Sequence, residues 1–323
     1  MQAQRSSYPD PLVVLPLRPP HTHTLILLHG LGSDGSPFGT KLLESTDLPA
    51  RLPTVKFVFP TASKRRSTML KKMRIKQWFD VYSLEDPGLR AELQIDGLCE
   101  TGASLRQLIE KESEILASGG QGQEGYGKII FGGLSQGCAA SIFTLLGGGF
   151  GGGADADGTS VKLGGFVGMS GWLPFEQQLR GLARDSDDDD DDDDNPFAQS
   201  SELADNAAGS VKQDKDIQVI NHVRDIFDLP MLSTSSLSSS PKKGPAMNLN
   251  HLQTPCFIGH GSVDEKISPR LGEGMADFLS SVLRMEVMWR AYEGLGHWYS
   301  VPDEIEDIVK FLKEKVGVPV VEQ

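Results

Sequence analysis

The chain has 323 residues, enough to bury the core of one large α/β domain, and nothing in its length requires a second domain. Its net charge is −13, and eight of the negative charges come from the single run Asp187–Asp194, so the rest of the chain is only mildly acidic. A mildly acidic body argues against nucleic acid as the main partner.

The three cysteines, Cys99, Cys138 and Cys256, are widely spaced and form no Cys-x-x-Cys or other metal-ligand pattern. We therefore expect free thiols in a reducing compartment, and no metal. The N-terminal segment is polar and Pro-rich, and no later window approaches the roughly 20 apolar residues of a membrane span. These features predict a cytoplasmic protein without a transmembrane segment.

Two apolar runs near the N-terminus predict strands. Leu12–Leu15 is a candidate edge strand, whereas Thr24–Leu28 is a continuous apolar run, typical of a strand buried in the middle of a sheet. The loop His29–Gly32 follows, and its glycines allow the main chain to come close to a ligand. We expect the backbone N–H of Leu31 to serve a substrate oxygen, and His29 to be a satisfied, partly buried histidine that shapes the loop.

The next predicted strand is Val55–Phe59, and Glu92–Leu116 predicts one long helix that covers the sheet. Between them lies a basic stretch, Lys64–Lys76. We expect a solvated loop there, and contact with an anionic membrane face is the alternative. The pair Trp78 and Phe79 belongs either to the core or to a pocket wall, and the pattern does not separate the two.

The segment Ile129–Ala140 joins an apolar strand, a serine between glycines and a helix that begins with small residues. The pattern Gly133-x-Ser135-x-Gly137 is that of a nucleophile elbow, in which a strained turn lifts the serine hydroxyl above the carboxyl end of the sheet. The first N–H groups of the helix then favour the negative charge of a tetrahedral intermediate. The five-residue pattern alone is a weak signal in a Gly-rich chain, so the surrounding elements have to decide.

A further strand is predicted at Leu163–Met169, and the composition changes abruptly after it. The range 175–250 contains Asp187–Asp194 and the Ser-rich tract Ser233–Ser240, and it cannot bury enough apolar surface to order itself fully. We expect one domain with a partly disordered acidic and Ser-rich insertion at 175–250. Within the insertion, apolar residues at helical spacing over Ile217–Phe227 predict an amphipathic helix that docks on the body.

The predicted elements after the insertion alternate between strand and helix: Pro255–Gly261, Ser268–Leu283, Glu286–Tyr292 and Pro302–Val316. Asp264 follows the first of these strands, and His297 follows the second in a glycine-flanked loop. The intervening helix and strand have about the same length, so both residues should reach the sheet edge where Ser135 ends. Asp303 and Asp277 are rival acids, but both fall on predicted helices.

The order Ser135, Asp264, His297 along the chain is the order of α/β-hydrolases. A serine hydroxyl is a poor nucleophile until an imidazole takes its proton, and the imidazole needs a carboxylate that fixes its tautomer. We therefore predict an α/β-hydrolase fold, with a mostly parallel central sheet, helices on both faces and these three residues as the catalytic triad.

At this point the sequence resembles a known family, the acyl-protein thioesterase and carboxylesterase group of serine α/β-hydrolases. Six motifs in order carry the resemblance, and they cover nearly all of the chain outside 175–250: His29–Gly32, Phe59-Pro60 with Trp78–Asp80, Gly133–Gly137, Ser170-Gly171 with Leu173-Pro174, His260-Gly261 with Asp264, and Gly294–His297.

The resemblance implies a serine esterase that needs no cofactor and acts on S-acylated proteins, lysophospholipids or small acyl esters. It also implies an oxyanion hole formed by the backbone N–H groups of Leu31 and Gln136. Trp78 and Trp298 are the candidate substrate-binding side chains. With substrates of this kind, transient contact between the protein and a membrane surface stays an open alternative.

The chain departs from the family pattern at Ser33–Gly35, at Glu265–Ser268 and in the basic stretch Lys64–Lys76. These segments flank the acyl pocket, so the natural substrate stays open while the catalytic assignment stands. One alternative is an interaction protein that keeps the fold and uses the acidic insertion and the amphipathic helix. Another is a peptidase or lactone hydrolase, because fold alone does not imply function.

Overall fold

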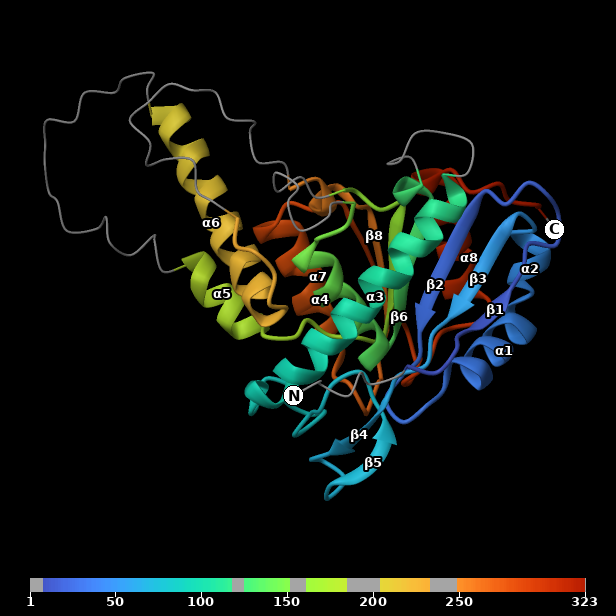
Figure 1. Ribbon diagram of the computed structural model, residues 1–323, viewed down its shortest axis with the longest axis horizontal. Coiled ribbons are helices and arrows are strands. Elements are labelled where there is room, and N and C mark those ends of the chain that lie inside the picture. Colours follow the sequence, from blue (N-terminus) through green and yellow to red (C-terminus); the bar gives the residue numbers. More distant parts are fainter. Residues whose placement is uncertain (1–7, 118–124, 152–160, 185–203, 233–248, 323) are drawn as a thin grey trace, which may run out of the picture.

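The computed structural model describes residues 8–117, 125–151, 161–184, 204–232 and 249–322, and for 204–214 it describes the backbone only (Figure 1). Its centre is a seven-stranded sheet in the order β1-β3-β2-β6-β7-β8-β9. The strands are β1 (Leu12–Val14), β2 (His23–Leu28), β3 (Val55–Phe59), β6 (Ile129–Leu134), β7 (Gly165–Met169), β8 (Cys256–Gly261) and β9 (Val287–Tyr292). All neighbouring strands are parallel except β1, which runs antiparallel to β3 at one edge.

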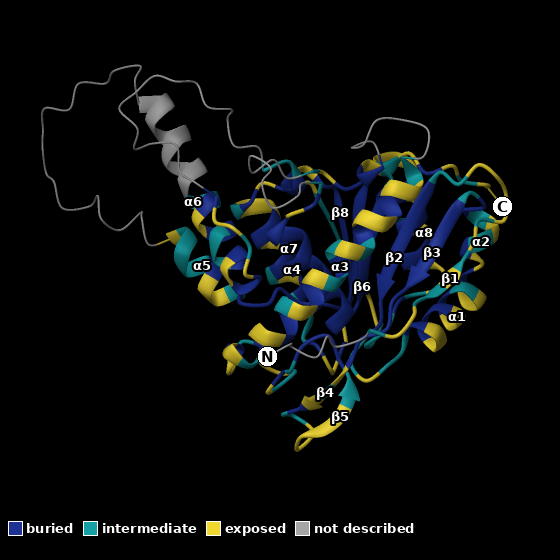
Figure 2. Ribbon diagram, in the orientation of Figure 1, coloured by how far each residue is buried: buried dark blue, intermediate teal, exposed yellow. Residues whose placement is uncertain are grey.

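Helices cover both faces of the sheet, and Figure 2 shows the strands buried between them. One apolar core includes residues of α3 (Ile95–Leu116), α4 (Gln136–Gly147) and α7 (Pro269–Asp277), and the other includes residues of α1 (Gly35–Thr46) and α8 (Asp303–Phe311). A strand with both faces covered has no polar side to show, which is why the central strands are continuous apolar runs. The predicted fold class and every predicted strand are confirmed.

Apart from α5 and α6, which are described below, the remaining helical elements in the described ranges are short or continue a longer helix. They are α2 (Leu48–Arg51), the 3-10 turns Ala91–Gln94, Tyr126–Lys128 and Asn250–Gln253, and the π-helical turns Phe278–Val282 and Leu312–Val316, which extend α7 and α8. No helix in the described ranges is long and apolar enough to cross a bilayer.

The basic stretch is a hairpin, so its prediction as a loop was wrong. Strands β4 (Lys64–Ser67) and β5 (Met73–Lys76) pair antiparallel and stand away from the main sheet (Figure 1). Lys71 and Lys72 make the turn with positive φ angles of 51° and 66°. Ser67 is the one buried residue of these two strands and most of their side chains are charged, so the hairpin has none of the apolar alternation by which a strand is recognised.

The predicted amphipathic helix is confirmed as the last part of α6 (Ala204–Ile226), which docks on the body. Ile220 and Val223 are buried, and the ring of Phe227 lies 5.3 Å from that of Phe143 on α4. Order also continues beyond Phe175 into α5 (Glu176–Arg184), so the insertion is more structured at its start than its composition indicates. The runs Asp187–Asp194 and Ser233–Ser240 lie outside the described residues.

Candidate active site

Ser135 lies between the end of β6 and the start of α4, with φ 57° and ψ −123°, a region that side chains rarely tolerate. The turn is forced by how closely the chain passes β2. A Cβ atom added at Gly137 would lie 2.4 Å from the carbonyl oxygen of Leu28, and one at Gly133 would lie 2.7 Å from the same atom. Only glycine fits on either side, and this explains the Gly-x-Ser-x-Gly pattern locally.

His297 and Asp264 come from the loops after β9 and β8, and the structure brings both to Ser135. The Nε2 atom of His297 is 3.0 Å from Ser135 Oγ, and its Nδ1 atom is 2.7 Å from Asp264 Oδ2. One imidazole thus connects a hydroxyl to a carboxylate through two hydrogen bonds. The rival acid Asp277 instead pairs with Arg180, and Asp303 is exposed at the start of α8.

Hydrogen bonds keep Asp264 charged. Burial opposes ionisation of this carboxyl, but hydrogen bonds from His260 and His297 and from the N–H groups of Ile267 and Lys266 outweigh burial and hold its pKa well below the usual range. The two N–H groups donate to Oδ1 at 3.0 and 2.9 Å. Its charge is therefore available to the imidazole at Oδ2 across the ordinary pH range.

His260 was not singled out as a partner of Asp264 by the sequence. Its Nε2 atom lies 3.2 Å from Asp264 Oδ2 and 3.0 Å from the carbonyl oxygen of Ile267, so one N–H serves both acceptors. The side chain is 1% exposed. His260 comes four residues before Asp264, near the end of β8, and the motif that joins His260-Gly261 with Asp264 was the available signal.

The loop after β2 is fixed by its own hydrogen bonds. His29 accepts from the N–H of Ala62 at Nε2 and donates from Nδ1 to the carbonyl oxygen of Gly30, and burial lowers its pKa to about 4. A neutral, fully buried imidazole holds the loop in place, which agrees with the role predicted for His29, although it is more buried than expected. The indole N–H of Trp78 donates to the carbonyl oxygen of His29 at 2.7 Å.

Leu31 and Gln136 are the two residues whose backbone N–H groups the sequence predicts as oxyanion donors. Leu31 lies in the fixed loop, and Gln136 provides the first N–H of α4, which has no partner within the helix. The Gln136 side chain accepts from the N–H of Trp78 and donates to the carbonyl oxygen of Phe79, so it is tied down.

A cavity of about 340 Å³ opens at Ser135. It is lined by Gly30, Leu31, Ser33, Phe38, Leu84, Leu134, Ser135, Lys266, His297 and Trp298. Trp298 therefore lies where a substrate-binding residue is expected. Trp78 does not: it is 1% exposed, packs against His29 and supports the loop from below, so its assignment to substrate binding is corrected.

Cys138 is the nearest other nucleophile in sequence, three residues beyond Ser135. It is fully buried, and burial raises the pKa of its thiol to about 12, so no thiolate competes with the serine. Within the described ranges no three His, Cys, Asp or Glu side chains are grouped to hold a metal ion.

A parallel sheet with a serine elbow, and an imidazole and a carboxylate at the same edge, defines the α/β-hydrolase class. The sequence model of the Phospholipase/Carboxylesterase family matches residues 10–187, more than half of the chain. The chain belongs to this family and is a carboxylic ester or thioester hydrolase.

Similar proteins agree in sequence and in fold. The chain is 27% identical to acyl-protein thioesterase 1 of Yarrowia lipolytica, over 95% of this chain and 98% of that protein. It is 26% identical to the Candida albicans protein of the same name, over 90% and 91%. Among solved structures, Zea mays acyl-protein thioesterase 2 superposes with a TM-score of 0.58 at 22% identity, covering 96% of this chain and 100% of the other. Arabidopsis thaliana SOBER1 gives 0.55 at 19%, covering 91% and 99%.

Proposed function

We propose that Ser135, His297 and Asp264 form a catalytic triad that hydrolyses acyl esters or thioesters through an acyl-enzyme. The observation that carries this proposal is the unbroken pair of hydrogen bonds, 3.0 Å from Ser135 to His297 and 2.7 Å from His297 to Asp264. Geometry of this kind lets the imidazole take the serine proton while the carboxylate stabilises the resulting imidazolium.

The reaction follows from these positions. Ser135 Oγ attacks the acyl carbonyl carbon as its proton passes to His297 Nε2, and the tetrahedral intermediate carries its negative charge on the former carbonyl oxygen. Backbone N–H groups of Leu31 and Gln136 are proposed to donate to that oxygen. Collapse of the intermediate expels the alcohol or thiol, which receives the proton from His297. Water then attacks the acyl carbon of the acyl-enzyme as its proton passes to His297. Ser135 Oγ leaves with the proton from His297, and the carboxylic acid is released.

The proposed substrates are S-acylated proteins, lysophospholipids or small acyl esters. The names of the related proteins support the first, and the cavity supports an acyl chain in general, because its walls include the apolar side chains of Leu31, Phe38 and Leu134. We also infer a cytoplasmic location from the three cysteines, none of which is in a disulfide.

We further propose that the β4–β5 hairpin makes transient contact with anionic membranes. Basic side chains occur on both strands, and Leu70 and Met73 are 40% and 62% exposed at its end. Arg66 and Arg74 face each other across the strands. Arg66→Glu with Arg74→Glu should reduce co-sedimentation with anionic vesicles and leave hydrolysis of a soluble ester unchanged. Equal binding to neutral and anionic vesicles would contradict the proposal.

The central experiment compares two serines: Ser135, which comes directly before α4, and Ser141, which lies within α4. Ser135→Ala should abolish hydrolysis of matched acyl thioesters and oxyesters with the fold retained, and a phosphonate probe should label Ser135 in the wild-type protein. Ser141→Ala is the control, since this buried serine donates only to the carbonyl oxygen of Cys138. Label on Cys138, or activity that survives in Ser135→Ala, would exclude the mechanism.

A further inference from the structure

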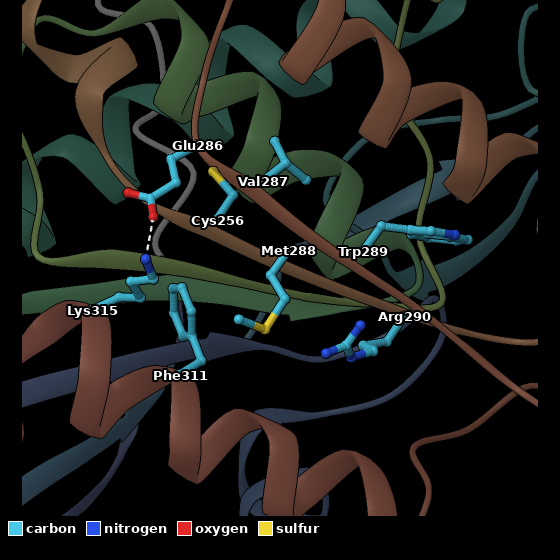
Figure 3. A pocket seen from close by; sticks show the side chains of 8 residues that line it. All are labelled: Cys256, Glu286, Val287, Met288, Trp289, Arg290, Phe311 and Lys315. Atoms are coloured by element: carbon cyan, nitrogen blue, oxygen red, sulfur yellow. Dashed lines mark ion pairs between the residues drawn. The ribbon is translucent and has the colours of Figure 1, made fainter.

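Strand β9 ends the sheet on the side opposite β1. Among the described strands it pairs only with β8, and Arg290 and Ala291 are exposed. A cavity of about 410 Å³ lies along this edge, lined by Cys256, Glu286, Val287, Met288, Trp289, Arg290, Phe311 and Lys315 (Figure 3). The edge therefore combines main-chain groups, apolar side chains and three charged side chains, one acidic (Glu286) and two basic (Arg290 and Lys315).

The pairing with β8 fixes which main-chain groups of β9 point outward. The carbonyl oxygens of Glu286 and Tyr292 accept from the N–H groups of Cys256 and Ser262, at 2.8 and 2.9 Å. Backbone groups two residues apart point to the same side of a strand, so the N–H and C=O groups of Met288 and Arg290 also face β8. The N–H and C=O groups of the alternate residues 287, 289 and 291 face away from the sheet, where they can pair with another strand.

We infer that β9 is a dimerisation edge, at which two copies of this chain pair their β9 strands antiparallel about a two-fold axis at Met288. The axis places Glu286 opposite the partner's Arg290, and Val287 opposite the partner's Trp289. The first is an opposite-charge pair and the second a β-branched–aromatic pair, both of which stabilise antiparallel strands. Residues 287 and 289 have main-chain groups that face outward, so residue 287 of one copy and residue 289 of the other form a hydrogen-bonded pair. Because of the two-fold symmetry, each of these contacts occurs twice.

The charges select this register from its neighbours. With the axis at Arg290, that guanidinium would face its own copy. With the axis at Trp289, Glu286 would face the partner's Tyr292 and Arg290 would face the partner's Met288. Only the axis at Met288 gives each charge a partner of opposite sign, since Glu286 and Arg290 lie two residues on either side of it.

The charges have partners within the chain as well. Glu286 lies 2.6 Å from Lys315 (dashed line in Figure 3), and Arg290 lies 3.5 Å from Asp307. Charges on an edge strand can also serve to block pairing. The side chains of Glu286 and Arg290 are 58% and 51% exposed, however, so both remain accessible to a partner. A purely protective edge needs no complementary spacing of opposite signs, whereas a two-fold pair of strands does.

Apolar contact supports the same occupant. Met288 and Phe311 line the cavity on the α8 side of the sheet (Figure 3). In the proposed register the partner's Met288 would lie beside this cavity, in a pair without main-chain hydrogen bonds, where opposite side chains approach most closely. A second copy of the chain therefore supplies main-chain, charged and apolar complements together.

The test is a charge exchange on the full chain, measured by sedimentation equilibrium. The wild-type protein should dimerise, and Glu286→Arg or Arg290→Glu alone should weaken dimerisation by about tenfold or more, because each places like charges opposite each other. The double variant Glu286→Arg, Arg290→Glu should restore dimerisation. Lys310→Glu, an exposed change on α8, is the control for net charge and should have no effect.

Hydrolysis of a small soluble ester and the thermal midpoint confirm that each variant is folded, since none of these residues touches Ser135. At a protein concentration of about 100 µM, mass action favours even a weak dimer. A wild-type chain that stays monomeric at this concentration would overturn the proposal. A dimer that the single exchanges leave intact, or that the double exchange does not restore, would overturn it too.

Discussion

The elbow around Ser135 and the α5–α6 segment are both tightly packed, but different contacts hold them. At the elbow the main chain itself is close, and a Cβ atom at Gly137 would lie 2.4 Å from the Leu28 carbonyl oxygen. Where the α5–α6 segment packs on α4, side chains interdigitate: the ring of Phe143 on α4 stacks at 5.6 Å on that of Phe175, which comes directly before α5. The first region positions reacting atoms and tolerates no added carbon, whereas the second contributes burial and tolerates changes of shape better than changes of polarity.

A single methyl group should separate the two regions most clearly. Gly137→Ala forces the elbow away from β2 and displaces Ser135, so kcat/KM for a small ester should fall by about a hundredfold or more. Gly181→Ala, on α5, meets nothing within 4 Å and should leave both activity and stability close to wild type or slightly raise stability. Near-normal activity of Gly137→Ala would show that the turn is less constrained than its contacts indicate.

A charge buried under α6 should lower stability and leave the preference between substrates unchanged. Ile220 on α6 is fully buried, so Ile220→Asp should lower the free energy of unfolding by about 3 kcal/mol or more. None of the α6 side chains that the structure describes, from residue 215 on, lines the cavity at Ser135, so the folded fraction should hydrolyse short and long acyl esters in the wild-type ratio. Gln218→Asp, exposed on the same helix, is the control for urea unfolding. A selective loss with long acyl chains would mean that α6 contacts substrate.

A carboxyl group beneath the His297 loop should make the stability of the site region depend on pH. Glu304 is 1% exposed, and its Oε2 accepts from the N–H of Ser300 at 2.9 Å. Burial raises its pKa to about 8, with a smaller contribution from Asp307, while the Ser300 hydrogen bond opposes the rise. Between its unfolded value of 4.5 and about 8, the unfolded chain has released this proton and the folded chain retains it, so stability falls as pH rises.

Urea unfolding of wild type and Glu304→Gln at several pH values measures this effect. From about pH 5.5 to about pH 7 the wild type should lose about 2 kcal/mol relative to the variant, which keeps the shape and the acceptor oxygen but does not titrate. Above about pH 8 the two curves should run parallel. Parallel curves throughout would show that Glu304 is already charged at pH 5.5.

The strands and the site were predictable where local composition decides the structure. Continuous apolar runs such as Thr24–Leu28 are typical of buried strands in a covered sheet, and the turn at Ser135 requires the glycines on either side of it. The approach of Asp264 and His297 followed from element lengths alone. Their catalytic roles stay predictions until the variants are measured.

Other features depend on contacts between distant segments. Helix α1 was missed because its start, where Asp34 accepts from the N–H of Ser36, has few apolar residues around it. The β4–β5 hairpin has no buried apolar face, and the place of Trp78 beneath His29 is set by tertiary packing. The partnership of His260 with Asp264 likewise appears only when β8 and the following turn are folded together.

The smallest effect is expected from the connection between α5 and α6. Residues 185–203 include Asp187–Asp194, which contributes eight negative charges and no apolar side chain. Replacing 185–203 with a Gly/Ser linker of equal length should leave thermal stability and hydrolysis of a small ester nearly unchanged, because the loop-closure entropy depends on length and not on these side chains. An Asp-to-Asn version of the run, equal in length and uncharged, separates charge from sequence. If the linker variant unfolds or loses activity while the Asn version does not, side chains of 185–203 outside Asp187–Asp194 support the fold. If both variants unfold or lose activity, the acidic run itself supports the fold, and it would count among the contacts that hold the α5–α6 segment.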